Sequence, residues 1–173
     1  MTLKILTRAA AVALAGALAG VGLALAQAAD PAPVENADGK YFDAEGYPTF
    51  NVAEDGTVDF HTFSGYRRYH AECQACHGPD GLGSTYAPSL VESVTAMSYE
   101  DFLGVVAGGR VNVGSSSQNV MPAFGTNPNV MCYLDDMYVY LRARAQGELP
   151  RGRPAKKEAK SEAFAEAEDA CMG

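Results

Sequence analysis

The chain has 173 residues, of which 47% are hydrophobic and 20% are charged, so it is long enough for one domain with its own core. Its 21 acidic and 13 basic residues give a net charge of -8. This charge argues against nucleic acid as a partner, because phosphate binding requires a cationic surface.

The N-terminal segment has the pattern of a secretory signal peptide. Lys4 and Arg8 precede an uncharged run of alanine, leucine, valine and glycine that ends in small residues. This order predicts that residues 1–26 are a signal, with cleavage near 26–29. The alternative is an uncleaved anchor helix, because the uncharged run 9–29 is nearly long enough to span a bilayer. Cleavage would leave a more acidic exported protein.

The next segment predicts an extended arm and then a helix. Residues 30–60 place short apolar runs between turn signals such as Asp38-Gly39 and Glu45-Gly46, which indicates an arm with one small hairpin. A helix is expected from about Ser64, a residue type that caps helices, to Cys73. This helix leads directly into two thiols and an imidazole.

Cys73, Cys76 and His77 form the pattern C-x-x-C-H, which is the attachment signature of c-type haem. The two thiols bond to the porphyrin, and the imidazole ligates the iron. A redox-active thiol pair normally lies in a thioredoxin-like βαβ unit, which this sequence lacks, and a zinc site needs a second pair of ligands close together. A disulfide within the motif would leave His77 without a role. The sequence therefore predicts one haem in a domain of residues 61–150.

A loop rich in glycine and proline follows at residues 78–90. An iron-bound imidazole is usually oriented by a hydrogen bond from its second nitrogen. We expect the Pro88 carbonyl to accept that bond and Leu90 to pack on the porphyrin. The alternative is that Pro88 only ends a turn.

A helix of about three turns is expected at residues 98–110, with Ser98 and Asp101 in capping-box spacing. The residues from 111 to 129 are expected to be irregular. They contain Met121, where the following Pro122 keeps the chain extended. A thioether in such a loop can lie across the porphyrin from His77.

Met121 is therefore the expected second axial ligand. Met131 and Met137 lie in a predicted helix, where methionine more often fills the core, and Met97 comes early for a chain that must wrap the porphyrin. The alternatives are His70 and an open axial position. A histidine and methionine pair favours ferrous iron and suits electron acceptance.

The strongest helix pattern covers residues 130–145, with an apolar stripe on one face and Asn129 as the expected cap. Beyond Pro150, the tail 151–173 is first basic and then acidic and rich in alanine. The acidic part predicts a short amphipathic helix.

From about residue 39 to 153 the chain resembles cytochrome c(L), the soluble monohaem cytochrome that accepts electrons from pyrroloquinoline quinone (PQQ) methanol dehydrogenases in the bacterial periplasm. The resemblance rests on DGKYFDAEGYPTFNVAEDGTVDF, SGYRRYHAECQACHGPDGLGSTYAP, NVMPAFG and MCYLDDMYVYLRAR followed by RGRPAK. C-x-x-C-H and MPAFG alone indicate only a class I cytochrome c. The long arm and the C-terminal ending point to this family.

The resemblance implies an all-α, class I cytochrome c-like fold around one haem, with His77 and Met121 as axial iron ligands. It also implies a PQQ-dependent methanol dehydrogenase as electron donor, a small cytochrome c or an oxidase as acceptor, a periplasmic location without a stable membrane anchor, and no enzymatic activity. It does not separate partners of calcium-dependent from partners of lanthanide-dependent dehydrogenases. The alternatives are a haem peroxidase or ligand sensor with an open axial site, and a cytochrome module of a membrane oxidase complex.

Cys132 and Cys171 lie outside the haem motif. In an oxidising compartment two leftover thiols most simply pair with each other, which would tie the tail to the last predicted helix. The alternatives are an intermolecular link and a buried free thiol.

The arm is rich in aspartate and asparagine, which raises the question of a bound calcium ion, although no run matches an EF-hand loop. Acidic arm residues are also a candidate docking surface for a lysine-bearing dehydrogenase, since complementary charge speeds association. A solvated polar surface is the alternative for each of them. The candidates are Asp43, Glu45, Glu54, Asp55 and Asp59.

Overall fold

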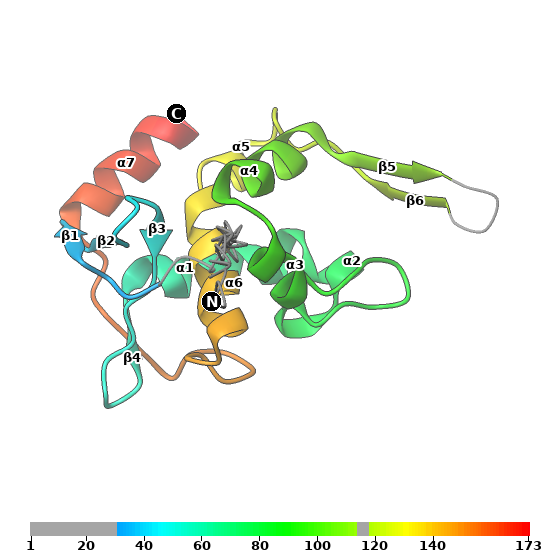
Figure 1. Cartoon of the computed structure of the whole chain (residues 1–173). Coiled ribbons are helices and arrows are strands. Elements are labelled where there is room, and N and C mark those ends of the chain that lie inside the picture. The colour runs from blue at the N-terminus through cyan, green and yellow to red at the C-terminus, as the bar shows by residue number, and fades with distance from the viewer. Residues whose placement is uncertain (1–30, 114–117) are drawn as a thin grey trace, which may run out of the picture.

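The computed structural model describes residues 31–113 and 118–173. The expected signal peptide therefore lies outside the described residues. Helices predominate in the described part, but strands are present too, so the fold is not strictly all-α (Figure 1). The strands form a three-stranded sheet whose order follows the sequence, a parallel pair and an antiparallel hairpin.

Two long helices, α1 (Phe60–Glu72) and α6 (Leu134–Gln146), pack against each other at the centre of the core. The sequence placed the start of α1 too late. The cap is Asp59, whose carboxylate accepts hydrogen bonds from the Thr62 amide at 2.8 Å and the Thr62 hydroxyl at 2.6 Å. Ser64 is instead a buried residue inside the helix. The helix gains one more turn because a buried carboxylate satisfies one of its first free amides, that of Thr62.

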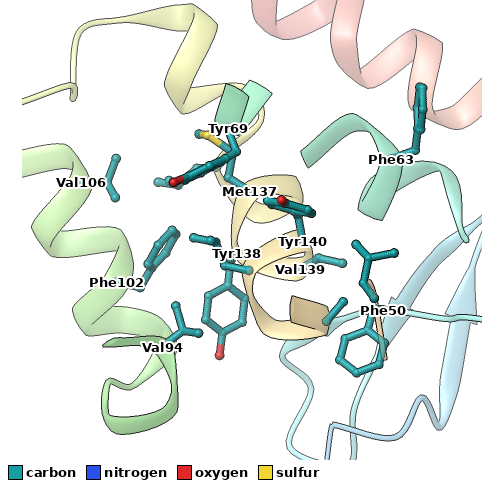
Figure 2. Packing of buried hydrophobic residues seen from close by; sticks show 14 of the residues in the cluster. Phe50, Phe63, Tyr69, Val94, Phe102, Val106, Met137, Tyr138, Val139 and Tyr140 are labelled. Atoms are coloured by element: carbon teal, nitrogen blue, oxygen red, sulfur yellow. The ribbon is translucent and has the colours of Figure 1, made fainter. Parts of the chain in front are cut away.

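The C-terminal helix pattern is divided into two helices. A short helix, α5 (Pro128–Met131), is capped by Asn127 rather than Asn129, and the chain turns at Cys132 and Tyr133 before α6 begins. Figure 2 shows the α6 side chains Tyr138, Val139 and Tyr140 within the buried cluster. Figure 2 also places Phe102 and Val106 on one side of this helix and Phe50 and Phe63 on the other.

Two further helices, α3 (Leu90–Ala96) and α4 (Tyr99–Gly108), close the side of the core that Phe102 and Val106 occupy. The predicted cap of α4 is confirmed, because the Ser98 side chain accepts a hydrogen bond from the Asp101 amide at 3.0 Å. Ser89 caps α3 in the same way. Both caps use a serine just before an apolar helical pattern, which is a local signal.

The segment expected to be irregular contains a hairpin, β5 (Arg110–Val113) and β6 (Gln118–Met121), which projects away from the helices (Figure 1). Arg110 pairs with Met121, and Val111 pairs with Val120. The side chains of Val111 and Val120 are 72% and 62% exposed. The two strands therefore lack a buried face. The alternation of buried and exposed residues that usually indicates a hairpin in a sequence is missing here.

The arm folds onto α6 as a small sheet of β1 (Glu35–Ala37), β2 (Lys40–Phe42) and β3 (Pro48–Thr49). A buried ion pair joins the two, because Arg142 of α6 donates to Asp43 at 2.7 Å. A buried pair of this kind is costly to break, since either partner alone would leave an uncompensated charge.

The tail returns across the N-terminal half of the core. Its strand β7 (Lys156–Lys157) pairs with β4 (Thr57–Val58), and the tail helix α7 (Glu162–Met172) buries Phe164. Cys132 and Cys171 form the intramolecular disulfide that the sequence suggested. None of the helices in the described ranges is long and apolar enough to cross a membrane.

Replacing both Cys132 and Cys171 with serine is expected to lower the free energy of unfolding by about 3 to 4 kcal/mol, because the open chain gains loop entropy in the unfolded state. Urea denaturation of the haem-loaded protein, followed by helical circular dichroism, measures this loss. Wild-type protein treated with a thiol reductant is the control and should show a similar loss. An unchanged urea midpoint in the double variant would show that the bond does not stabilise the fold.

Candidate functional site

An apolar cavity lies between α1, α3, α4, α6 and the chain that follows the hairpin. Three of the predicted haem residues and the predicted axial methionine line it: Cys73, His77, Leu90 and Met121. Most of the other lining side chains are aliphatic or aromatic residues of the core. Residues far apart in the sequence therefore meet around one water-poor space.

The two thiols lie where α1 ends. Cys73 is the C-cap of α1, and a short helix, α2 (Gln74–His77), carries Cys76 on the surface. Both thiols are free. Burial raises the pKa of the Cys73 thiol to about 12.

His77 is buried, and one of its ring nitrogens is held by the following loop. Its Nδ1 lies 2.9 Å from the carbonyl oxygen of Pro88, which is the partner that the sequence suggested. A carbonyl oxygen only accepts hydrogen bonds, so Nδ1 carries the proton and Nε2 is left with its lone pair. Leu90, at the start of α3, lines the same cavity. His77 is therefore arranged as a metal ligand through Nε2.

Met121 is anchored to the end of α4. The amides of Phe124 and Gly125 donate to the last carbonyls of that helix, Val106 and Ala107, each at 3.0 Å. These carbonyls have no partner within the helix, so the chain after Met121 satisfies them. The anchoring fixes the base of the hairpin against the cavity.

Close backbone packing fixes the same position. Gly109 has φ +72°, and a Cβ there would lie 2.6 Å from the Met121 carbonyl oxygen. Two other methionines, Met97 and Met137, also line the cavity, and Met137 Sδ lies 3.8 Å from Cys73 Sγ. Whether all three thioethers share one space cannot be read from the sequence, because it depends on tertiary packing.

The other histidines lie elsewhere. His61 Nδ1 is 2.6 Å from Asp136, on the side facing α7. His70 Nδ1 is 2.8 Å from the Tyr66 carbonyl oxygen, and its Nε2 is 3.7 Å from Asp80. Neither histidine lines the cavity. This placement disfavours His70 as an axial ligand.

Two of the suggested docking carboxylates are structural. Asp43 is bound to Arg142, and Asp59 caps α1, so neither faces a partner. Desolvation by burial raises the pKa of Asp59. Asp55 pairs with Lys156 on the surface, and the docking interpretation applies only to exposed side chains such as Glu45 and Glu54.

The suggested calcium site gains no support in the described ranges. No group of three or more histidine, cysteine, aspartate or glutamate side chains there could hold a metal ion.

The residues that are present fit a covalent haem. Two free thiols stand next to an imidazole whose second nitrogen is anchored, and a thioether lies in the same apolar cavity. Imidazole and thioether are the ligands that electron-transfer c-type haems use. The apolar walls keep water away from such a group.

The known proteins that this chain is similar to are cytochromes. Residues 62–141 match a family model described as cytochrome c oxidase, cbb3-type, subunit III. The chain is 56% identical over 150 residues to cytochrome c-553I of Paracoccus denitrificans. The matched region covers 87% of this chain and 66% of that protein, or just under two thirds of its length. It is 36% identical over 100 residues to cytochrome c-555 of Methylococcus capsulatus, covering 57% of this chain and 75% of that protein.

A solved structure is also similar. The crystal structure of the c-type cytochrome XoxG from Methylobacterium extorquens AM1 is 56% identical, with a TM-score of 0.75 over 80% of this chain and 85% of that chain. The fold is therefore that of a cytochrome c. These relatives are electron-transfer cytochromes rather than enzymes. The chain belongs to the c-type cytochromes, proteins that bind haem covalently and carry electrons.

Proposed function

We propose that this protein is a periplasmic carrier that takes single electrons from a PQQ-dependent methanol dehydrogenase and passes them to a small cytochrome c or an oxidase. The observation that carries the proposal is the meeting of Cys73 and His77, from the C-x-x-C-H motif, with Met121 around one apolar cavity. The resemblance to cytochrome c(L) supports the choice of donor. The cleaved signal peptide expected at residues 1–26 supports the location.

In this proposal Cys73 and Cys76 hold the haem through thioether bonds, and His77 and Met121 ligate its iron. Bound haem supplies a one-electron couple between ferric and ferrous iron. The residues 61–150 form the haem domain, flanked by the arm 30–60 and the tail 151–173.

The protein residues tune this couple. The Pro88 carbonyl orients the His77 ring through its Nδ1 proton. The apolar cavity walls disfavour the more highly charged ferric state, and a thioether ligand raises the reduction potential in the same direction. Ligation by Met121 would leave no open axial position of the kind that a peroxidase or a gas sensor requires.

Anaerobic stopped-flow spectroscopy tests the donor. Haem-loaded protein is mixed with a PQQ methanol dehydrogenase and methanol, and the expected result is reduction of the haem only when both are present. Separate runs with a calcium-dependent and a lanthanide-dependent enzyme identify which class is the partner. Complete reduction by ascorbate together with no reduction by either enzyme would reject the proposed donor but not the carrier role.

A further inference from the structure

Tyr69 contacts both the cavity and the backbone next to His77. Its side chain is 0% exposed, and its ring lines the cavity beside Cys73 and His77. Figure 2 shows this ring next to Met137. The Tyr69 hydroxyl donates a hydrogen bond to the Gly78 carbonyl oxygen at 2.6 Å. The side chain thus joins the core of α1 to the turn that follows the expected iron ligand.

This turn has carbonyl groups that α2 cannot satisfy, because the helix ends at His77. The carbonyl oxygens of His77 and of both its neighbours accept hydrogen bonds. The carbonyl oxygen of the residue before His77 accepts a hydrogen bond from the Ser84 hydroxyl. The carbonyl oxygen of His77 accepts one from the Gly83 amide at 2.8 Å. Both of these donors lie in the same loop and move with it. The third donor, Tyr69, bonds the Gly78 carbonyl oxygen and comes from α1 in the helical core.

The turn is tightly packed, so a shift at one point moves the rest of it. Gly78 has φ +73°, and a Cβ there would lie 2.1 Å from the Gly83 carbonyl oxygen. The loop continues to Pro88, whose carbonyl faces His77 Nδ1. A tether on Gly78 therefore restrains the backbone on both sides of the imidazole.

We propose that Tyr69 is a positioning residue for His77: its hydroxyl, fixed in α1, holds the turn after His77 and so sets the orientation of the imidazole. This inference rests on the proposed ligation of haem iron by His77. The orientation of an axial imidazole affects the electronic structure of the iron and its reduction potential. The hydrogen bond of Tyr69 would then tune the electron carrier without touching the iron.

Two tyrosine-to-phenylalanine variants test the role of the hydroxyl. Tyr69→Phe removes one oxygen atom and keeps the ring. Tyr140→Phe is the matched control, because Tyr140 is also 0% exposed, its ring centroid lies 5.5 Å from that of Tyr69, and its hydroxyl has no hydrogen-bond partner among the described residues. Both variants are expected to fold with haem attached.

The readouts are the g-values of the oxidised haem-loaded protein by electron paramagnetic resonance, the midpoint potential, and hydrogen exchange at the Gly83 amide. Tyr69→Phe is expected to shift the g-values and the potential, and to speed exchange at Gly83 by about 3- to 10-fold, because one hydrogen bond no longer restrains the turn. Tyr140→Phe is expected to match the wild type in all three.

Wild-type behaviour of Tyr69→Phe in all three readouts would overturn the inference and leave the proposed function standing. Equal shifts in both variants would also overturn it, because they would assign the effect to ring packing rather than to the hydroxyl. A wild-type spectrum without low-spin, histidine-ligated iron would overturn both the inference and the proposed function.

Discussion

Replacing Gly65 with alanine is expected to destabilise the protein by at least about 3 kcal/mol, at the upper end of the cost of overpacking a core. An added Cβ would lie 1.9 Å from the carbonyl oxygen of Asp136 and 2.5 Å from its carbonyl carbon. Both atoms belong to the backbone of α6, so no side-chain rotation relieves the contact. The crossing of α1 and α6 would have to open.

The matched control is Gly104→Ala in α4, where an added Cβ meets nothing within 4 Å. Alanine favours a helix over glycine by about 1 kcal/mol, so this variant should be as stable as the wild type or slightly more stable. Urea denaturation of the haem-loaded proteins measures both changes. Equal stability of the two variants would show that the helices do not cross closely at Gly65.

Local sequence signals predicted the features that depend on neighbouring residues. The Ser98 cap is confirmed because the capping side chain and its target amide lie three residues apart. The contact between His77 and the Pro88 carbonyl is also local, since the two residues are only eleven positions apart. The glycine- and proline-rich chain between them has few ways to bring a carbonyl back to the imidazole. The haem assignment of Cys73 and Cys76 rests on a motif of five residues and stays a proposal for this chain.

The errors occur where distant residues decide the structure. Asp43 looked like a surface carboxylate because its partner, Arg142, lies 99 residues away. The start of α1 is an exception, because Ser64 was chosen as the cap by its residue type while Asp59 caps the helix through the Thr62 amide, three residues away. The hairpin was missed because Val111 and Val120 face solvent, so the usual alternation of buried and exposed residues carries no signal.

The choice among methionines shows the same limit. Met137 was assigned to the core and Met97 was set aside as too early, yet both line the cavity with Met121. Sequence position distinguishes a loop methionine from a helical one, but it does not show which thioethers share a space. Three candidate sulfur atoms in one cavity call for an experiment that removes them one at a time.

Replacing Met121 with leucine is expected to remove the sulfur ligand while keeping nearly the same volume. The oxidised protein should lose the long-wavelength sulfur-to-iron band, and the midpoint potential should fall by on the order of 0.2 V, within the roughly 0.8 V range that axial ligands control. Met97→Leu and Met137→Leu are the matched controls and should keep the band, because the proposal assigns the iron to Met121 and to neither of these residues. Optical spectra and redox titration of the three variants decide the question. Loss of the band in Met97→Leu or Met137→Leu, with Met121→Leu unchanged, would assign the axial sulfur to that residue. It would also show that Met121, at the end of the hairpin, does not ligate the iron.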